Sequence, residues 1–285
     1  MAIIMDGRGL AEKVKKQVRE EIERIKKAGT HPTLYSILIG DDEASKAHIQ
    51  VKTKAFDSVG IKHITRQIEE GTLQHEVENF IYRLNNRHEV NGIMIQLPLP
   101  PGYDKYGLID TIGSSKDVDG LTPVNIAGLH RGTDYLEPCT LKGIMSLLDH
   151  YDIDPRGKDV AILGSRGVVG KPLSFMMMEK GATVQLCHSE TNDLLSKILS
   201  ADIVVTAVGR PHYVTADMVK EGAVVIDVGE NRLWGKIVGD VDFENVKEKA
   251  GYITPVPGGV GPMNVASLMQ NVVKACCMQG ADIPF

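Results

Sequence analysis

The sequence predicts an α/β protein of two domains, and three observations lead to this prediction. Helix and strand signals alternate along the chain, which is typical of parallel sheets covered by helices. A second series of strands begins near residue 159 with a glycine-spaced turn of the doubly wound type. The length of 285 residues exceeds that of an average single domain. We expect residues 1–138 with 264–285 to form an N-terminal α/β domain, and residues 139–263 a Rossmann-like domain.

The first series of elements follows from apolar spacing and turn residues. Residues 10–25 carry apolar side chains at helical spacing among charges, and Gly29 follows as a stop. Residues 98–136 are polar and rich in turn signals, so we expect a long connection there. The remaining expected elements are strands at residues 34–39, 61–65 and 92–97 and helices at 43–59 and 73–85.

The second series has the doubly wound layout. A linking helix is expected at residues 141–150, and helices of about ten residues are expected between the strands that follow. The last helix, residues 264–279, has one apolar face and is followed by Gly280. The expected strands of this series lie at residues 160–163, 183–186, 203–207 and 224–228.

Composition and charge narrow the possible functions. Hydrophobic residues make up 42% and charged residues 24% of the chain, as in soluble globular proteins. The net charge of −5 and the isoelectric point near 6.0 argue against a nucleic-acid partner, so small molecules are the expected ligands. Four scattered cysteines fit a reduced, cytoplasmic setting. The sequence shows no metal-ligand spacing and no apolar run that would span a membrane.

A glycine-spaced turn marks the second series. Residues 159–172 have the sequence DVAILGSRGVVGKP, in which Gly164, Gly167 and Gly170 separate a strand from a helix. Amide groups at the start of a helix attract anions, and glycines let a pyrophosphate approach the backbone. The spacing departs from the usual GxGxxG pattern, so this segment alone could also be a tight structural turn.

The end of the next strand favours a dinucleotide site. Residues 187–191, with the sequence CHSET, lie where such folds bind the adenosine ribose. Glu190 is an acid of the kind that binds an unphosphorylated ribose, so NAD remains possible beside NADP. The donors expected around the 2′-phosphate of NADP are Ser165, Arg166, His188 and Ser189.

A lysine interrupts the apolar face of the helix expected at residues 43–59. Lys52 falls within the stripe that includes Ile49 and Phe56, and Ser45 and His48 project from the same side. Removing an ammonium from water is unfavourable and lowers the lysine pKa, which suits the group to proton transfer near neutral pH. The alternative is a lysine whose stem lies along apolar surface while its charged head reaches water.

Three further segments add polar or glycine-rich features. Gln96 is the last polar residue of the strand at 92–97, and the ends of parallel strands are where sites form. Residues 116–120, with the sequence KDVDG, could alone be a solvated turn. Residues 255–262, with the sequence PVPGGVGP, predict a rigid loop instead of a helix or strand, either a connection or a rim that faces a ligand.

Together and in this order, these segments resemble the bifunctional methylenetetrahydrofolate dehydrogenase/methenyltetrahydrofolate cyclohydrolase family over essentially the whole chain. The resemblance implies a folate-binding catalytic domain, an NAD(P)-binding domain, a cleft between them and a homodimer. The segments that carry it are the helix with Ser45 and Lys52, QLPLP at 96–100, KDVDG at 116–120, the turn at 164–172, Val228-Gly229, and PGGVGP at 257–262.

The resemblance also implies two reactions of one-carbon metabolism. Oxidation of 5,10-methylenetetrahydrofolate with NADP would give 5,10-methenyltetrahydrofolate, which water would convert to 10-formyltetrahydrofolate. Its expected catalytic residues are Lys52 as general acid/base, Gln96 to orient it, Asp119 as acceptor for the pterin N–H groups, and His48. Residues expected along the folate are His48, Lys52, Gln96, Leu97, Pro98, Asp119, Pro257, Gly258 and Gly259. Residues expected along the cofactor are Gly164, Ser165, Arg166, Gly167, Val169, Gly170, His188, Ser189, Ala207, Val208, Gly209, Val228 and Asn231.

The chain departs from the family pattern at several positions. His48 stands where the family usually has tyrosine, and an imidazole can still stack on an aromatic ring. Ser165-Arg166 reverses the common order of arginine and serine. Leu141 and Asn264 stand where proline and threonine are common, and we expect both to be tolerated.

Two other functions remain to be weighed against this one. A dehydrogenase without hydrolase activity would have no need of Lys52 as a proton-transfer group. A regulatory module that binds a dinucleotide without turnover would fit the glycine turn, but no basic patch or DNA-binding helix supports it.

Overall fold

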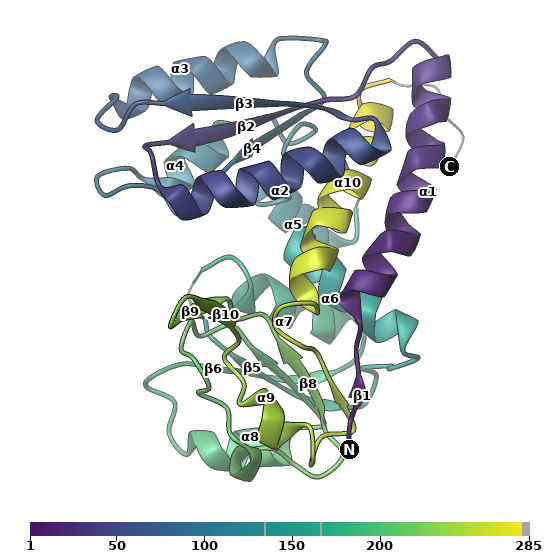
Figure 1. Cartoon of the computed structure of the whole chain (residues 1–285), viewed down its shortest axis with the longest axis vertical. Coiled ribbons are helices and arrows are strands. Elements are labelled where there is room, and N and C mark those ends of the chain that lie inside the picture. The colour runs from purple at the N-terminus through teal and green to yellow at the C-terminus, as the bar shows by residue number, and fades with distance from the viewer. Residues whose placement is uncertain (134, 166, 281–285) are drawn as a thin grey trace. The chain divides into compact units, whose positions relative to one another are not determined.

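The computed structural model describes residues 1–133, 135–165 and 167–280, which form two compact units (Figure 1). The first, here called the Lys52 unit, comprises Lys13–Cys139 and the C-terminal residues from Val265 onward. The second, called the Gly164 unit, comprises Met1–Glu12 and Thr140–Asn264. Both units contain a parallel sheet with helices, which confirms the predicted α/β class.

A three-stranded parallel sheet of order β3-β2-β4 forms the base of the Lys52 unit. The central strand β2 (Thr33–Ile39) is buried at all but one position, which explains its almost continuous apolar sequence. The edge strand β3 (Lys62–Ile68) carries exposed polar and charged residues, and β4 (Gly92–Ile95) is buried throughout.

Helices pack on both faces of this sheet (Figure 1). Helices α3 (Gln74–Asn85) and α4 (Lys105–Asp110) form one core with the side of β2 that carries Ile37 and Ile39. Helix α2 (Glu43–Val59) contacts β2 and β3. Successive side chains of a strand alternate between faces, so α2 lies on the face that carries Ser36. The unit also contains α5 (Pro123–Arg131), most of α1 (Gly7–Lys27) and most of α10 (Val260–Met278).

A six-stranded parallel sheet of order β1-β11-β8-β7-β5-β6 forms the base of the Gly164 unit. Its helices are α6 (Cys139–His150), α7 (Gly170–Glu179), α8 (Leu194–Ser200) and the short α9 (Phe243–Val246). The strands are β1 (Ile3–Ile4), β5 (Asp159–Leu163), β6 (Thr183–Cys187), β7 (Ile203–Thr206), β8 (Val224–Asp227) and β11 (Tyr252–Ile253).

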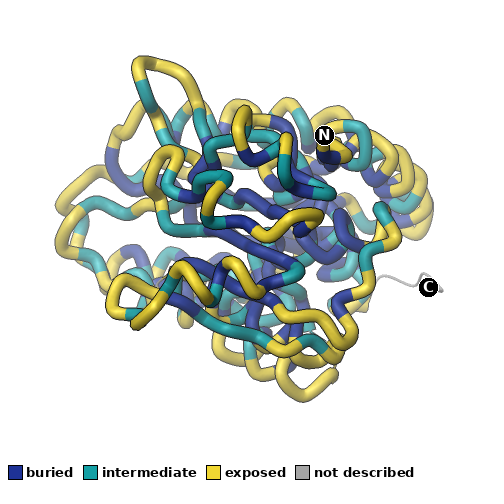
Figure 2. Tube along the Cα trace, turned by 90° about the horizontal axis from the view of Figure 1, so that it is seen from below, coloured by how far each residue is buried: buried dark blue, intermediate teal, exposed yellow. Residues whose placement is uncertain are grey.

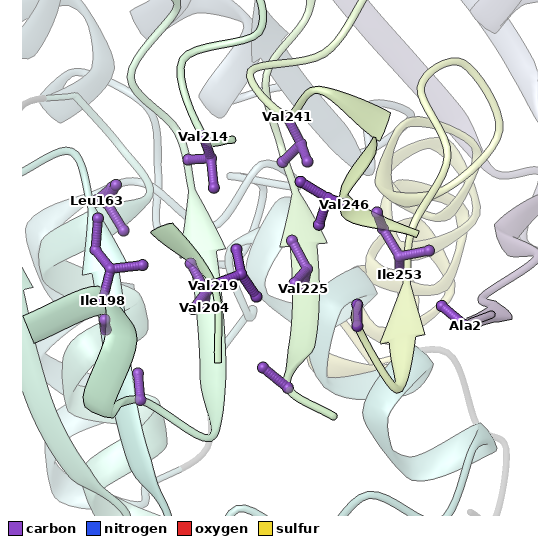
Figure 3. Packing of buried hydrophobic residues seen from close by; sticks show 14 residues of the cluster. Ala2, Leu163, Ile198, Val204, Val214, Val219, Val225, Val241, Val246 and Ile253 are labelled. Carbon is purple, nitrogen blue, oxygen red and sulfur yellow. The ribbon is translucent and has the colours of Figure 1, made fainter. Parts of the chain in front are cut away.

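The core of the Gly164 unit fills one side of this sheet with small apolar residues. Leu163, Val204, Val225 and Ile253 come from four strands and point to the same side (Figure 3). Ile198 of α8 packs against them. Strands β4, β7 and β8 are buried throughout, whereas the edge strands β1 and β3 are largely exposed. Figure 2 shows buried segments in the interior and exposed segments on the outside.

The first residues of the chain lie in the other unit from the one that the predicted domain division gave them. They were expected in the first domain, but Ile3 pairs with Tyr252 and Ile4 with Ile253 in the sheet of the Gly164 unit. The backbone N–H of Ala2 also donates a hydrogen bond of 2.7 Å to the carbonyl of Lys247 in this unit. Local periodicity cannot reveal such a strand, because it has two residues and its partner lies far away in the sequence.

Three other expectations were wrong in detail. The connection at residues 98–136 contains α4 and α5, and α5 begins at Pro123, which suits the first turn of a helix. The segment between β7 and β8 holds only a 3₁₀ turn, Ala216–Met218, where a helix was expected, and β9 (Asn231–Leu233) and β10 (Lys236–Val238) form an unexpected hairpin. Helix α10 already begins at Val260. Pro262 lies in its first turn, where a proline is tolerated because its missing N–H would have no intrahelical partner.

Candidate functional site

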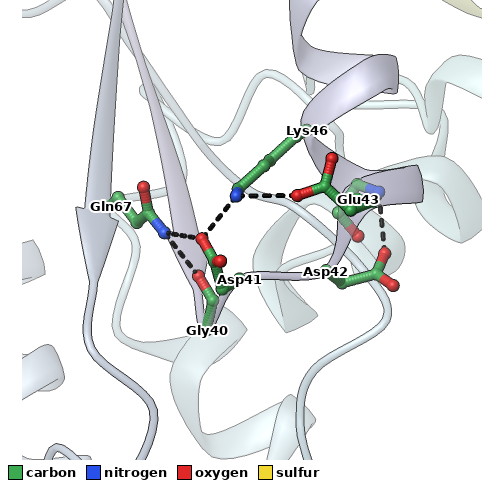
Figure 4. Close-up of polar contacts among 7 residues, drawn as sticks. Gly40, Asp41, Asp42, Glu43, Lys46 and Gln67 are labelled. Carbon is green, nitrogen blue, oxygen red and sulfur yellow. Dashed lines mark hydrogen bonds and ion pairs between the residues drawn. The ribbon is translucent and has the colours of Figure 1, made fainter.

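A capped helix start positions the polar face of α2. The Asp42 carboxylate accepts a hydrogen bond of 2.7 Å from the backbone N–H of Ser45, one of the first amides of the helix. Lys46 forms ion pairs with Asp41 and Glu43 on the outer side (Figure 4). Gln67 of β3 in turn donates to the Asp41 carboxylate at 2.7 Å, which ties this helix start to the sheet.

Lys52 lies on the face of α2 that carries the buried residues Ser45, Ile49 and Phe56, as predicted. Its ammonium nitrogen donates a hydrogen bond of 3.1 Å to the side-chain oxygen of Gln96. Ser45, which is 3% exposed, and the half-buried His48 precede it on the same helix face. Burial lowers the pKa of Lys52, and the negative charge of Asp119 opposes this shift.

Gln96 is fixed from both ends of its side chain. It is 5% exposed and directly follows β4, and its backbone N–H donates to the Ile37 carbonyl at 2.8 Å. Its side-chain nitrogen donates to the Leu97 carbonyl at 2.7 Å, which leaves the amide oxygen directed to Lys52. Leu97 and Pro98, joined by a cis peptide bond, continue from this point.

The two acids of the KDVDG segment have different roles. Asp117 is 1% exposed, and its carboxylate accepts hydrogen bonds from the backbone N–H groups of Gly120 and Thr122 and from Asn125. Asp117 therefore builds the turn. No added side chain would fit at Gly120, since a Cβ there would lie 2.5 Å from the carbonyl carbon of Glu137. The turn presents Asp119, whose own backbone carbonyl accepts from the N–H of Cys139.

Asp119 and Lys52 are electrostatically coupled. Burial raises the pKa of Asp119 to about 6; the positive charge of Lys52 opposes this shift, and the negative charge of Asp117 adds to it. Both groups thus have pKa values displaced toward neutrality, the condition that proton-transfer sites require. The structure joins Lys52 to Gln96 by a hydrogen bond, places the charge of Asp119 within electrostatic reach of Lys52, and puts His48 one helical turn before Lys52. Their catalytic roles stay predictions.

A half-buried histidine next to this group was not predicted. His63 of β3 lies between two hydroxyl groups, 2.7 Å from Ser36 Oγ and 2.7 Å from Thr53 Oγ1. Burial, together with the nearby charge of Lys52, lowers the pKa of His63 to about 4. The neutral ring of His63 in β3 therefore contacts Ser36 of β2 and Thr53 of α2, the residue after Lys52. A serine within the apolar strand β2 was the one available sign of this network.

The glycines of the predicted rim contact the start of α1 within the Gly164 unit. The N–H of Arg8 donates to the Gly258 carbonyl at 3.1 Å, and a Cβ on Gly7 would lie 1.8 Å from the Gly259 carbonyl oxygen. Gly258 and Gly259 are buried, whereas Pro257 is exposed. The glycines are thus explained by close backbone packing, and their assignment to the substrate stays a prediction.

The glycines of the 164–170 turn have distinct surroundings. A Cβ on Gly164 would lie 2.4 Å from the Ala207 carbonyl oxygen, and one on Gly170 would lie 1.9 Å from the Gly164 carbonyl oxygen. Gly167 has a φ of +88° and no atom near an added Cβ among the described residues. Two glycines therefore let the backbone pack closely, and the third, three residues before α7, has open space at its Cβ position.

A pocket of about 300 Å³ extends from this turn to the ends of β6 and β7. Six of the predicted cofactor residues line it: Gly164, Ser165, His188, Ser189, Ala207 and Val208. Arg210 and Tyr213 line it too and were not predicted. Arg166 lies outside the described residues. The residues predicted for the cofactor that do not line this pocket are Gly167, Val169, Gly170, Gly209, Val228 and Asn231.

A buried carboxylate organises the loop after β7. Asp240 is 0% exposed, and one of its oxygens accepts hydrogen bonds from the N–H groups of Val208 and Gly209 at 2.7 and 3.2 Å. The other oxygen accepts from the N–H of Arg210 and from the Asn231 side chain. The predicted residues Val208, Gly209 and Asn231 are therefore connected through one acid.

Within residues 1–133, 135–165 and 167–280, no group of three or more His, Cys, Asp and Glu side chains could hold a metal ion. No helix in these ranges is both long and apolar enough to cross a membrane.

Two family models match the chain. Residues 5–119 match the catalytic domain of tetrahydrofolate dehydrogenase/cyclohydrolase, and residues 138–280 match its NAD(P)-binding domain. A bifunctional protein FolD from Sulfurihydrogenibium is 50% identical over 275 residues, which cover 95% of this chain and 96% of that protein.

Solved structures agree in fold. The bifunctional enzyme FolD, methylenetetrahydrofolate dehydrogenase/cyclohydrolase, of Campylobacter jejuni superimposes with a TM-score of 0.95 at 44% identity, covering 98% of this chain and 99% of that one. The methylenetetrahydrofolate dehydrogenase-cyclohydrolase (FolD) of Trypanosoma brucei, solved with NADP and an inhibitor, gives 0.92 at 34% identity, with 97% and 98% covered. A shikimate dehydrogenase of Thermus thermophilus shares the fold alone, at 15% identity and a TM-score of 0.53, with 86% of this chain and 98% of that one covered.

Proposed function

The chain belongs to the tetrahydrofolate dehydrogenase/cyclohydrolase family, and on that premise we propose which of its residues carry the two reactions. The enzyme oxidises 5,10-methylenetetrahydrofolate to 5,10-methenyltetrahydrofolate and hydrolyses this product to 10-formyltetrahydrofolate. We assign folate binding and catalysis to the Lys52 unit and cofactor binding to the Gly164 unit. The observation that carries the assignment is the hydrogen bond between the partly buried Lys52 and the buried Gln96.

The oxidation chiefly requires that the nicotinamide ring of NADP and the folate be placed correctly against each other. When bound, NADP accepts the hydride that leaves the methylene carbon of the folate. In this proposal the open space at Gly167 and the amides at the start of α7 hold the pyrophosphate, and the 300 Å³ pocket holds the adenosine end. Arg166 is also assigned to this site on the sequence pattern.

The hydrolysis requires proton transfer, and Lys52 is the proposed acid/base. Water adds to the methenyl carbon and gives a proton to the neutral Lys52 amine. The carbon–N5 bond then breaks, the Lys52 ammonium protonates N5, and the hydroxyl proton of the intermediate leaves to solvent, so one proton is released overall. The lowered pKa of Lys52 supports this role, because a lysine with its ordinary pKa would hold too little neutral amine near pH 7.

Gln96, Asp119 and His48 are proposed to position the folate and the lysine. Gln96 accepts a hydrogen bond from the Lys52 nitrogen through an uncharged oxygen. The main effect on the Lys52 pKa is therefore burial, which lowers it. Asp119 accepts hydrogen bonds from the pterin N–H groups, in keeping with a carboxylate that Asp117 holds in a rigid turn. His48 stacks on an aromatic part of the folate. Leu97, Pro98, Pro257, Gly258 and Gly259 are assigned to the substrate on the family pattern.

The absorbance of methenyltetrahydrofolate separates the two reactions. In Lys52→Met protein we expect methenyltetrahydrofolate to form with NADP and then to decay only at its spontaneous rate. Lys54→Met is the matched control, because Lys54 is exposed on the same helix. Enzymatic decay at the wild-type rate in Lys52→Met would show that another group performs the proton transfer.

We also propose that the enzyme is a cytoplasmic homodimer. The family resemblance supports a dimer, and four free cysteines are consistent with a reducing compartment. Light scattering on the eluted peak of a gel-filtration column would test the dimer, for which a mass near twice the 31.1 kDa of the chain is expected.

A further inference from the structure

The pocket of the Gly164 unit contains a cationic residue that the family motif does not account for. Arg210 follows β7 and lines the 300 Å³ pocket together with Ser165, His188 and Ser189. Arg210 is the only lysine or arginine among the described residues that line this pocket. The motif position that commonly holds arginine is occupied by Ser165, which has no charge.

The backbone of Arg210 is held firmly in place. Its N–H donates a hydrogen bond of 3.0 Å to one oxygen of Asp240, and the preceding N–H groups of Val208 and Gly209 donate to the other oxygen. Asp240 is fully buried, so these bonds form away from water. The loop therefore presents the arginine side chain from a fixed point.

The side chain of Arg210 is available to a ligand. Its guanidinium carbon lies 5.7 Å from the ring centroid of Tyr213, another residue of the pocket. The side chain is exposed, and no carboxylate of the described residues pairs with it. A guanidinium that rests on an aromatic ring keeps its N–H groups free for two parallel hydrogen bonds to a phosphate.

The position in the fold indicates which phosphate this is. The pyrophosphate belongs at the glycine turn, whereas the ribose of the adenosine belongs at the end of β6, where His188 and Ser189 lie. Resting on the NADP site proposed above, we propose that Arg210 is a specificity-determining residue that binds the 2′-phosphate and thereby selects NADP over NAD. Arg210 thus offsets Glu190, whose acid would favour an unphosphorylated ribose.

Equilibrium binding of two nucleotides that differ only in this phosphate tests the inference. Adenosine 2′,5′-bisphosphate and adenosine 5′-monophosphate would be titrated calorimetrically into wild-type, Arg210→Ala, Arg210→Lys and Arg156→Ala protein. Arg156 is exposed in the same unit and does not line the pocket, so its variant is the matched control. We expect Arg210→Ala to weaken the bisphosphate about 10- to 100-fold and to leave the monophosphate within about twofold. Arg210→Lys should restore part of the loss.

Three other results would overturn the inference. An equal loss for both nucleotides would show that Arg210 shapes the pocket and does not read the phosphate. Unchanged binding of the bisphosphate by Arg210→Ala, together with a loss in Arg166→Ala, would assign the phosphate to Arg166. Wild-type protein that binds neither NADP nor the bisphosphate would refute the cofactor site itself, and this outcome is visible before any variant is made.

Discussion

Lys52 and Gln96 are joined by a hydrogen bond of 3.1 Å from the ammonium nitrogen of the lysine to the amide oxygen of the glutamine. The amide cannot turn over without loss of the bond from its nitrogen to the Leu97 carbonyl. The lysine thus has a neutral, oriented acceptor in a buried place. An anion there would stabilise the ammonium and raise the lysine pKa, which would oppose its use as a base.

Replacement of Gln96 by glutamate should therefore shift the pH dependence of hydrolysis. The added carboxylate favours the charged form of Lys52, so we expect the rise of the cyclohydrolase rate with pH, which reports the neutral amine of Lys52, to move to a pH at least about one unit higher. Gln50→Glu, at an exposed position of α2, is the control. Identical pH profiles for Gln96→Glu and wild type would show that the residue at position 96 does not influence the protonation of Lys52.

Asp119→Asn should abolish folate binding and yet stabilise the protein at neutral pH. The carboxyl pKa of Asp119 is raised from 3.8 to about 6, so its contribution favours the folded state below pH 3.8 and is lost as the pH rises through 6. The variant escapes this loss, and at pH 8 we expect its free energy of unfolding to exceed that of wild type by about 1 to 3 kcal/mol.

Urea unfolding of both proteins at several pH values between 3.5 and 8 measures the effect, with roughly 3.8 to 6 as the informative range. Asp110→Asn, at an exposed position of α4, should change stability little at any pH. A constant difference between Asp119→Asn and wild type across this range would contradict the raised pKa.

Two glycines of the cofactor turn should respond differently to alanine. Gly170→Ala would place a Cβ 1.9 Å from the Gly164 carbonyl oxygen, so we expect a marked drop in the melting temperature. Gly167→Ala meets no atom of the described residues and should lose only about 1 to 2 kcal/mol through its positive φ. Its added methyl group would occupy the proposed pyrophosphate space and weaken NADP binding more than tenfold. Normal NADP affinity in folded Gly167→Ala protein would place the pyrophosphate elsewhere.

Asp240→Asn tests the loop after β7. The carboxylate faces only donors, including the N–H groups of Val208, Gly209 and Arg210, and an amide would turn an NH₂ group toward some of them. We expect a loss of about 1 to 3 kcal/mol in stability and a raised KM for NADP with kcat for oxidation nearly unchanged. Asp242→Asn, two residues on, is the control. A fall in kcat with KM unchanged would argue against a role in cofactor positioning.

Two residues of the candidate site could be singled out from the sequence because each breaks a local pattern. Lys52 interrupts an apolar helix face, and Gln96 ends an apolar strand. The carboxylates of the KDVDG segment were found by resemblance, since an acid–x–acid–glycine sequence suits any turn. Structure was needed to separate Asp117, which builds the turn, from Asp119, which the turn presents.

Other features had no local signal, apart from the serine of β2 that bonds to His63. Arg210 is an exposed arginine after a turn, which in a sequence is indistinguishable from an ordinary surface charge. His63 follows a strand pattern of mixed polarity at a sheet edge, and its partners Ser36 and Thr53 come from other elements. Strand β1 has two residues, both exposed, and is recognised only through its pairing with β11.

That pairing has a consequence for biosynthesis. Because a ribosome makes the chain from its amino end, Ile3 emerges long before its partner Tyr252. In the sheet order β11 separates β1 from β8, so a nascent chain that stops short of β11 leaves β1 without a neighbour. The sheet of the Gly164 unit is therefore completed only after Tyr252 and Ile253 have been made. Until then the backbone groups of Ile3 and Ile4 that pair with β11 have no partner strand.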